Sequence, residues 1–531
     1  MRRYFELLYP LLFAASVVLA IAARGVGQFE GADLLLVTAL AVLVAAAALG
    51  LMLVVVRLAG RSDRAEPLAA TLTMLFVAWF FFYTPAQRAV TAITWRFSRP
   101  VVVIPLGILA TVAIVVWLLR QPARRLTRIN EYMTRFGVIL VAVVAAQSAL
   151  TWYRAPSKTR ASRLVNELAQ PVRVAAPPPA ERNTPKRDIY LIVLDGHLNS
   201  QRLREVLQYD NASFDDSLRA LGFTVPRAMR SNYTQTILSV PSLLNATLLT
   251  QLAEDAGPNN PSFALPKYLV ENNRAARFLK SQGYKYVLFP SAWWTGSQHS
   301  PIADSEFDAR PEFDLRHEMR RTELRRAVVK STLLGYMGGV EVDALFDVRS
   351  MAGLRRMAAD SAPTFVFAHF LLPHIPYYLD EQCRVLPNPI VPGREGVVAD
   401  RGRAAYIAQL RCVDRMTLDV VTTLLRDSRP EPVILIVGDH GSRFADPFFM
   451  SHPDSVSTAF IRERFGAFGA FHLPAGGDSA FVESVSLVNV MGNVLRYYFN
   501  AALPPTADTM YVSGELPFRF YAVDTTGYVA R

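Results

Sequence analysis

Three apolar runs of the sequence end in residues that suit metal binding or acid–base chemistry. The three junctions are Ile189–Leu194 before Asp195-Gly196-His197, Val433–Val437 before Gly438-Asp439-His440-Gly441, and Thr364–Leu372 before Pro373-His374. An aspartate that ends a buried strand is costly unless something pairs with its charge, and a divalent cation would do so. Carboxylate oxygens and imidazole nitrogens suit zinc or manganese. The competing interpretation is a helix N-cap, and it is weakest for Asp439-His440, because the flanking glycines permit the tight backbone that adjacent ligands need.

A hydroxyl-rich loop supplies candidate nucleophiles. The stretch from Ser231 to Asn245 has the pattern of a loop that leads into a helix, and Thr234, Thr236 and Ser239 lie within it. A hydroxyl at a helix N-terminus lies in a field that favours an alkoxide and an incoming phosphate. Coordination to a metal would activate it further. The alternative for each hydroxyl is ordinary helix capping.

The elements that must position these residues alternate between short β-branched runs and amphipathic helical stretches. From residue 188 to residue 508 the sequence predicts one α/β domain with a largely parallel sheet, in which ligands gather at the carboxyl ends of the strands. The strands are predicted at Ile189–Leu194, Tyr284–Phe289, Thr364–Phe370, Val433–Val437 and Gly466–Leu473, with a helix over Ala404–Leu425. Asp304–Asp360 is interpreted as a charged helical insertion over this core, and residues 509–531 as a polar, aromatic tail.

The first 152 residues predict a membrane domain of five helices. The apolar runs are Tyr4–Ala23, Leu34–Val56, Leu68–Tyr83, Val101–Leu119 and Phe136–Trp152, each near the roughly 20 residues that cross a bilayer. The first run alone also fits a signal peptide, and buried core helices are the general alternative. With the N-terminus in the cytoplasm, ten arginines lie in inside segments and four outside, as the positive-inside rule requires. Residues 153–187, with three consecutive prolines, are then a linker to a domain outside the cytoplasm.

Composition limits the remaining possibilities. The 531 residues carry a net charge of +11, with 51% hydrophobic and 19% charged residues. The arginines form no single basic face, so nucleic acid is not expected as a partner. Only Cys383 and Cys412 are present, which excludes a disulfide-dense scaffold and a cysteine-based zinc finger. Both lie outside the membrane on this topology, where they could form one disulfide worth roughly 3–4 kcal/mol.

The order of these motifs resembles the sulfatase-like branch of the alkaline phosphatase superfamily. The strand before Asp195, a helix-capping Thr236, His374 after a strand and Gly438-Asp439-His440-Gly441 follow that pattern. Five spans before an extracytoplasmic domain resemble the membrane phosphoethanolamine transferases and the lipoteichoic acid synthases. In the phosphoethanolamine transferases the nucleophile is the second threonine of a Thr-x-Thr followed by Ser-Val-Pro, which selects Thr236 in this sequence.

The resemblance implies a role for each site residue. Asp195, Asp439 and His440 would hold one divalent metal, zinc or else manganese, with Thr236 as the fourth ligand and the phosphorylated nucleophile. His374 would contact the transferred group or protonate the leaving oxygen. His452, which lies 13 residues after Asp439, Asn232 and Arg443 complete the predicted substrate-binding set.

Two departures from the family keep the reaction open. The transferases usually have glutamate in place of Asp195, and the chain lacks the Cys/Ser-x-Pro-x-Arg motif of formylglycine sulfatases. The first hypothesis is a membrane enzyme that moves a phosphoethanolamine or phosphoglycerol headgroup from a phospholipid to an extracytoplasmic glycan or lipid. The alternatives are a phosphodiesterase or phosphatase on the same site, and a catalytically inactive envelope scaffold. All three place the protein in the bacterial inner membrane with its catalytic domain outside the cytoplasm.

Overall fold

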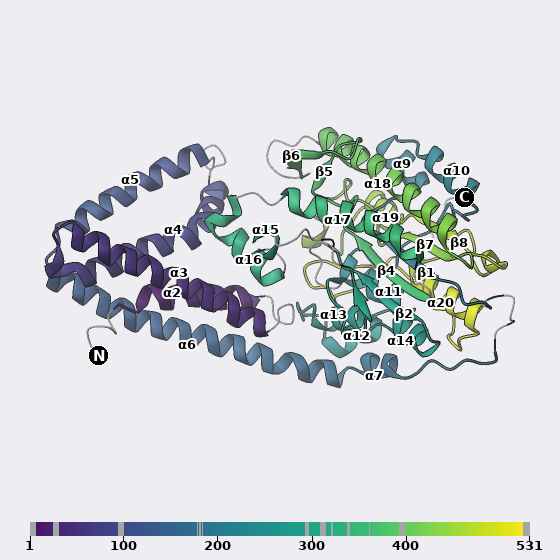
Figure 1. The fold of residues 1–531 in the computed structure, drawn as a ribbon, viewed down its shortest axis with the longest axis horizontal. Coiled ribbons are helices and arrows are strands. Elements are labelled where there is room, and N and C mark those ends of the chain that lie inside the picture. The colour runs from purple at the N-terminus through teal and green to yellow at the C-terminus, as the bar shows by residue number, and fades with distance from the viewer. Residues whose placement is uncertain are drawn as a thin grey trace. The chain divides into compact units, whose positions relative to one another are not determined.

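The computed structural model divides the chain into two compact units. Unit 1 combines Met1–Pro156 with Leu315–Gly339, and unit 2 combines Ser157–Asp314 with Val340–Arg531. The structure describes residues 7–24, 31–93, 100–177, 179, 182, 184–291, 297–307, 309, 315–319, 322–336, 340–359, 362–391 and 399–523. Figure 1 labels the helices and strands of both units.

Four of the predicted apolar runs of unit 1 fall within a helix, and the fifth, Tyr4–Ala23, is helical from Tyr9 onward, with residues 4–6 outside the described part of the chain. The helices are α2 (Tyr9–Arg24), α3 (Gly31–Leu58), α4 (Ala65–Ile93), α5 (Pro100–Leu119) and α6 (Ala123–Ala161), with a short 3-10 turn η1 at Ser62–Arg64. By length and composition, the described residues include three helices able to cross a membrane, Gly31–Leu58, Ser62–Tyr83 and Ala123–Leu150, while Tyr9–Ala23 and Pro105–Leu119 are shorter. The expected five-helix count is therefore not confirmed.

Unit 1 also contains a segment from the middle of the sequence. Residues 315–339 form α15 (Leu315–Glu318), α16 (Glu323–Ser331) and η4 (Leu333–Tyr336), and α16 packs against α2, α3 and α4. Leu324 is fully buried in their core. Arg325 Nε donates to Asp33 Oδ1 at 2.7 Å, and the Thr322 hydroxyl also bonds to Asp33. The predicted insertion over the catalytic core was thus wrong for these residues, because their apolar positions complete the helix packing of unit 1.

Unit 2 is an α/β domain around a six-stranded, mostly parallel sheet, as predicted. The strand order is β3-β2-β4-β1-β7-β8, with only β8 antiparallel to its neighbour. The strands are β1 (Ile189–Leu194), β2 (Lys285–Phe289), β3 (Ser305–Glu306), β4 (Thr364–Phe370), β7 (Val433–Gly438) and β8 (Gly469–His472). Two hairpins lie apart from this sheet, β5 (Tyr377–Leu379) with β6 (Val385–Ile390), and β9 (Tyr511–Val512) with β10 (Tyr521–Ala522).

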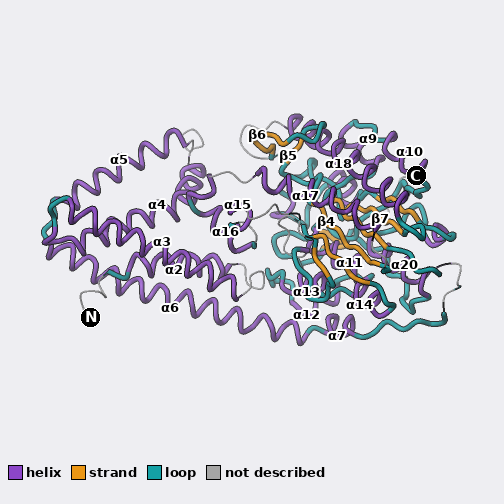
Figure 2. The backbone as a smooth tube through the Cα atoms, in the orientation of Figure 1, coloured by secondary structure: helices purple, strands orange, loops and turns teal. Residues whose placement is uncertain are grey.

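Helices cover both faces of this sheet, as Figure 2 shows. The central strand β1 is buried along its whole length, which explains its continuous apolar run. Ile189, Leu191 and Val193 join the core under α11 (Thr236–Asn245), α14 (Arg274–Ser281) and α20 (Leu487–Phe499). The alternate residues join the core under α10 (Ala212–Ala220), α17 (Val340–Leu354) and α18 (Ala399–Asp427).

The remaining elements of unit 2 are short. They are α7 (Arg163–Ala169), α9 (Ser200–Leu207), α12 (Thr250–Ala256), α13 (Ala264–Glu271), η5 (Arg355–Ala359), η6 (Phe449–Ser451), α19 (Thr458–Phe465) and η7 (Gly477–Ala480). The predicted linker contains α7, which begins with a Ser162 cap on Val165 and buries its apolar side chains against α12, α13 and Phe518.

Candidate metal centre and nucleophile

Neighbouring strands bring the two aspartates together. Strands β1 and β7 pair in parallel, and Leu194 is level with Gly438. The next residue of each strand, Asp195 and Asp439, therefore emerges at the same edge of the sheet. Gly196 turns the chain there with a φ of +74°, a conformation that few other residues adopt. Its N–H donates to Asp439 Oδ1 at 3.0 Å, so the two junctions hold each other in place.

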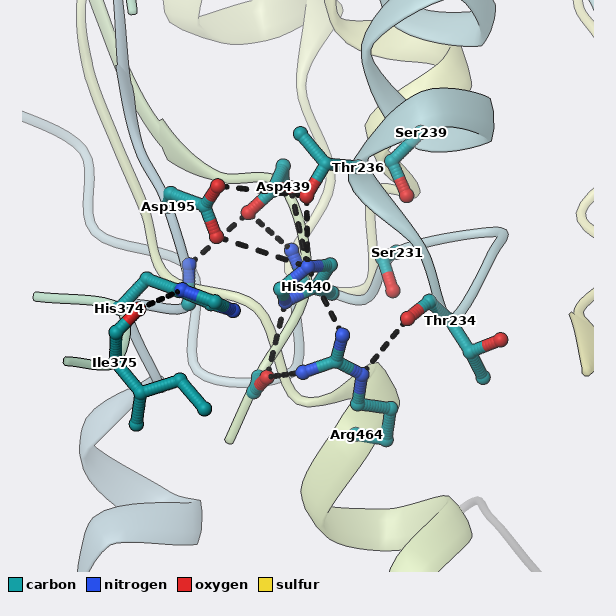
Figure 3. Close-up of polar contacts among 12 residues, drawn as sticks. Asp195, Ser231, Thr234, Thr236, Ser239, His374, Ile375, Asp439, His440 and Arg464 are labelled. Atoms are coloured by element: carbon teal, nitrogen blue, oxygen red, sulfur yellow. Dashed lines mark hydrogen bonds and ion pairs between the residues drawn. The ribbon is translucent and has the colours of Figure 1, made fainter. Parts of the chain in front are cut away.

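Asp195, Asp439 and His440 form a group fit for a cation (Figure 3). One ligand atom from each lies within 4.8 Å of the others, and all three residues are buried. His440 Nε2 lies 3.3 Å from Asp439 Oδ2 and 3.7 Å from Asp195 Oδ1. Neither of these carboxylate oxygens has a hydrogen-bond partner among the described residues. Buried polar atoms rarely lack a partner, so these orphaned oxygens fit a divalent cation as the missing one.

The His440 ring is oriented as a ligand. Its Nδ1 faces the Gly441 carbonyl at 3.0 Å, and because a carbonyl only accepts, Nδ1 carries the proton and Nε2 keeps its lone pair. A backbone carbonyl behind the ring is a common partner of metal-binding histidines. Burial, reinforced by the positive charge of Arg464, holds the pKa of His440 well below its usual value. The imidazole is therefore neutral at neutral pH, as a metal ligand must be.

The carboxylates of Asp195 and Asp439 are held close together despite the repulsion between their negative charges. Burial raises the pKa of Asp195 above its usual value, and nearby His374 and Arg464 oppose the shift. Burial and the negative charge of Asp195 raise the pKa of Asp439 to about 7. Two acidic groups that share a buried site resist ionising together, and a bound cation would remove that resistance.

Thr236 is the hydroxyl that reaches this group. It is the first residue of α11, and its Oγ1 lies 3.0 Å from His440 Nε2 and 3.4 Å from Asp195 Oδ2. The other two candidates are engaged elsewhere: Thr234 Oγ1 contacts the Ser513 backbone, and Ser239 Oγ donates to the Tyr233 carbonyl. Among the three hydroxyls, the geometry thus favours Thr236 as the nucleophile.

His374 and Arg443 lie beside the group without belonging to it. His374 Nδ1 donates to the Ile375 carbonyl at 2.6 Å, which leaves Nε2 for proton exchange, and its ring centroid is 6.1 Å from that of His440. Burial lowers the pKa of His374, and Asp195 partly restores it. Arg443 is partly buried and interacts electrostatically with Tyr377 and Asp195. Both positions are compatible with contact to a substrate.

Three other histidine and asparagine side chains are engaged elsewhere. Asn232 accepts from the Val488 N–H and donates to the Thr509 carbonyl, so its side chain ties α20 to the C-terminal segment. His452 pairs with Asp446 at 2.8 Å, and no described contact joins it to the candidate metal ligands. His197 uses both ring nitrogens, toward the Leu198 carbonyl and Asp414, and it supports the turn after β1.

Two buried residues beside the group, Arg464 and His369, are absent from the site predicted from the sequence. Arg464, at the end of α19, lies with Nη2 at 3.0 Å from His440 Nε2. The signal was a charged pair, Glu463-Arg464, directly before an apolar run. His369 is fully buried in β4, with Nδ1 2.5 Å from Ser297 Oγ and Nε2 3.7 Å from Asp195 Oδ2. That Nε2 has no hydrogen-bond partner among the described residues.

The C-terminal segment and the cysteines stabilise the surroundings. The Gln235 side chain, one residue before Thr236, donates to the Ser513 and Gly514 carbonyls. The segment that the sequence left unassigned therefore holds the nucleophile loop. Cys383 and Cys412 form a disulfide between the β5–β6 turn and α18.

No protein-family model matches the chain, and no curated protein matches it. Among solved structures, it is similar to the C-terminal periplasmic domain of EcEptC from Escherichia coli in complex with zinc. The identity is 13%, the TM-score 0.42, and 67% of this chain and 96% of that chain are covered. The soluble domain of lipooligosaccharide phosphoethanolamine transferase A from Neisseria meningitidis has 13% identity and a TM-score of 0.41, over 63% of this chain and 93% of that one.

A phosphonate monoester hydrolase of Agrobacterium radiobacter is also similar, with 12% identity and a TM-score of 0.39 over 62% of this chain and 80% of that one. With identities of 12–13% and TM-scores of 0.39–0.42, these similarities are too weak to assign a function. The chemistry of this chain is therefore argued from its own residues.

Proposed function

We propose that the chain is a membrane-anchored, metal-dependent transferase that moves a phospho-alcohol headgroup from a phospholipid through a phospho-threonine intermediate. The observation that carries this proposal is the position of Thr236 Oγ1, at a helix N-terminus and within 3.4 Å of both a carboxylate and an imidazole suited to a cation. The acceptor would be an extracytoplasmic glycan or lipid. The apolar helices of unit 1 would keep the site close to its lipid donor, which raises the effective donor concentration.

The reaction would proceed in two half-reactions on one residue. The Thr236 oxygen forms a bond to phosphorus while the bond from phosphorus to the lipid alcohol breaks, and the threonine proton ends on that alcohol. The acceptor hydroxyl then attacks phosphorus, its proton returns to Thr236, and the headgroup is transferred. A divalent cation held by Asp195, Asp439 and His440 would lower the pKa of the Thr236 hydroxyl and neutralise charge on the phosphoryl oxygens.

The chain's own groups provide the remaining functions. Helix α11 directs its N-terminal dipole toward the phosphoryl group. His374, with Nδ1 fixed on the Ile375 carbonyl, exchanges the proton through Nε2, giving it to the leaving alcohol and taking it from the acceptor. Asp195 and Asp439 are buried, so water cannot screen their charges. Their electrostatic attraction for the cation is therefore strong.

The test is intact-mass analysis of the full-length protein in detergent, loaded with zinc and incubated with phosphatidylethanolamine or phosphatidylglycerol. We expect a mass increment on the wild type and on Thr234→Ala, a matched control in the same loop, and none on Thr236→Ala. The size of the increment identifies the headgroup. An increment that survives in Thr236→Ala would overturn the assignment of the nucleophile. Steady release of the headgroup into water, with no transfer to added lipid or glycan, would instead indicate the hydrolase.

A further inference from the structure

Arg464 is held against the candidate metal ligands by three contacts (Figure 3). Its side chain is only 4% exposed. Nε donates to the Thr234 carbonyl at 2.8 Å, Nη1 donates to the Gly441 carbonyl at 2.6 Å, and Nη2 lies 3.0 Å from His440 Nε2. Two contacts are therefore to the backbone beside the nucleophile and beside the metal ligand. They fix the plane of the guanidinium so that Nη2 faces the site.

This buried cation lacks a direct counter-ion among the described residues. The neighbouring Glu463 carboxylate accepts from Ser442, Phe444 and Ala445, and it attracts Arg464 electrostatically without forming a direct ion pair with it. Burial and the charge of Arg443 lower the pKa of Arg464 to about 10, so it is still charged at neutral pH. An unpaired buried charge is strongly unfavourable unless an anion completes the site.

The contact between Nη2 and His440 is incompatible with metal binding. The Nδ1 proton of His440 points at the Gly441 carbonyl, so Nε2 has one lone pair, and Nη2 and Thr236 Oγ1 both lie 3.0 Å from it. That lone pair cannot accept from Nη2 and ligate a cation at the same time. When His440 serves as a ligand, Nη2 loses its acceptor while Nε and Nη1 keep theirs. The freed N–H group is left beside Thr236, directed at the reacting centre.

The charges of the site indicate which group replaces His440 Nε2 as the acceptor for Arg464 Nη2. The two carboxylates of Asp195 and Asp439 balance one divalent cation, which leaves the two positive charges of Arg464 and Arg443 with the single nearby carboxylate of Glu463, an excess of one positive charge. A phosphate ester carries one or two negative charges and accepts well from guanidinium N–H groups.

We propose that Arg464 forms a phosphate subsite, in which Nη2 donates to a non-bridging oxygen of the phosphate ester on or next to Thr236. The inference rests on the proposed function for the identity of the ester, but the subsite itself can be tested without turnover. It assigns to Arg464 the binding of phosphate mono- and diesters, as distinct from a structural role behind His440.

The experiment measures binding of zinc and of inorganic phosphate separately, on the full-length protein in detergent. Zinc affinity is measured by competition with a chelator, and phosphate binding to the zinc-loaded protein by calorimetry. The variants are Arg464→Gln, Arg464→Lys and, as a control on the exposed face of the same helix, Arg462→Gln. We expect Arg464→Gln to keep zinc affinity within about threefold of wild type and to weaken phosphate binding roughly ten- to hundredfold, since a hydrogen bond to a charged group contributes about 1.5–3 kcal/mol. Arg464→Lys should recover part of the loss, and Arg462→Gln should match the wild type.

Three results would overturn the inference. The first is wild-type phosphate affinity in both Arg464 variants. The second is a parallel loss of zinc and phosphate affinity in both variants, which would mean that Arg464 only positions His440. The third is that the zinc-loaded wild type binds no phosphate. If Arg464→Gln fails to fold, the phosphate affinity of Arg464→Lys tests the inference alone. Lysine keeps the charge, but its ammonium group cannot bond to both carbonyls and also reach the phosphate, so this affinity should be lower than that of the wild type. Arg464-dependent phosphate binding without any mass increment on Thr236 would refute the proposed function and leave the subsite standing.

Discussion

Gly441 is the position where a single methyl group should most sharply test the geometry of the metal centre. A Cβ placed there would lie 2.0 Å from the Glu463 carbonyl oxygen and 2.7 Å from Leu198 Cδ2. The Gly441 N–H donates to the Arg464 carbonyl at 2.7 Å, and its own carbonyl accepts from His440 and Arg464. The methyl group of Gly441→Ala would therefore push apart two backbone segments that position the site.

The size of the effect follows from this clash. A Cβ rarely approaches a carbonyl oxygen closer than about 3 Å, so the segments must separate by on the order of 1 Å, and overpacking of this kind costs about 1–3 kcal/mol. Because the His440 ring is oriented by the Gly441 carbonyl, it moves with the backbone. We expect zinc affinity to fall by about tenfold or more, and the rate of Thr236 modification by about a hundredfold, the usual cost of a 1 Å misplacement.

The assay is chelator competition for zinc on the full-length protein, with a melting curve in parallel. Gly50→Ala is the matched control, because a Cβ at this exposed position in α3 meets nothing within 4 Å. It should leave zinc affinity unchanged and should not lower the melting temperature, because alanine is the more favourable residue inside a helix. If Gly441→Ala bound zinc and melted like the wild type, the proposed coupling of the glycine backbone to the His440 ring would be refuted.

Three further predictions concern stability. Replacing Cys383 and Cys412 by serine should lower the free energy of unfolding of the catalytic unit by up to about 3.5 kcal/mol, given the 29-residue separation; an unchanged urea midpoint would contradict this. The raised pKa of Asp439, about 7, means that its contribution to stability is present at acidic pH and lost as pH rises through that value. The melting temperature of the metal-free protein should thus fall between about pH 4 and pH 7, and this fall should disappear when zinc is bound. A metal-free melting temperature that rises over this range would show the sign to be wrong. Asp33→Ala removes one of the two carboxylate partners of Arg325, the one on α3, so residues 315–339 should be cleaved faster by trypsin in intact vesicles. Equal cleavage rates would contradict this.

The strands and the two aspartates could be predicted because local pattern determines them. The continuous apolar run of β1 is what a strand buried on both faces requires, and a polar residue directly after such a run must lie at the edge of the sheet. The prediction that Asp195 and Asp439 meet needed only that their strands be parallel and close. The strand order itself, with β1 between β4 and β7, depends on long-range packing that no local pattern reports.

The residues that were missed act over long distances in the sequence. Gln235 and Ser513 are 278 positions apart, and Arg464 reaches Thr234 across 230. In isolation each has the composition of an ordinary loop or surface helix. The segment at 315–339 was misassigned for a related reason, since its charged residues conceal the few apolar positions, among them Leu324 and Val328, that pack on the helices of unit 1.

The membrane unit is completed late in synthesis. Its N-terminal part ends at residue 156, and its last piece begins at residue 315. At about 5–20 residues per second, the ribosome needs roughly ten to thirty seconds to bridge that interval. Throughout it, Asp33 lacks Arg325 and the helices lack Leu324. The helices of unit 1 therefore reach their final packing only after most of unit 2 up to residue 314 has been synthesised.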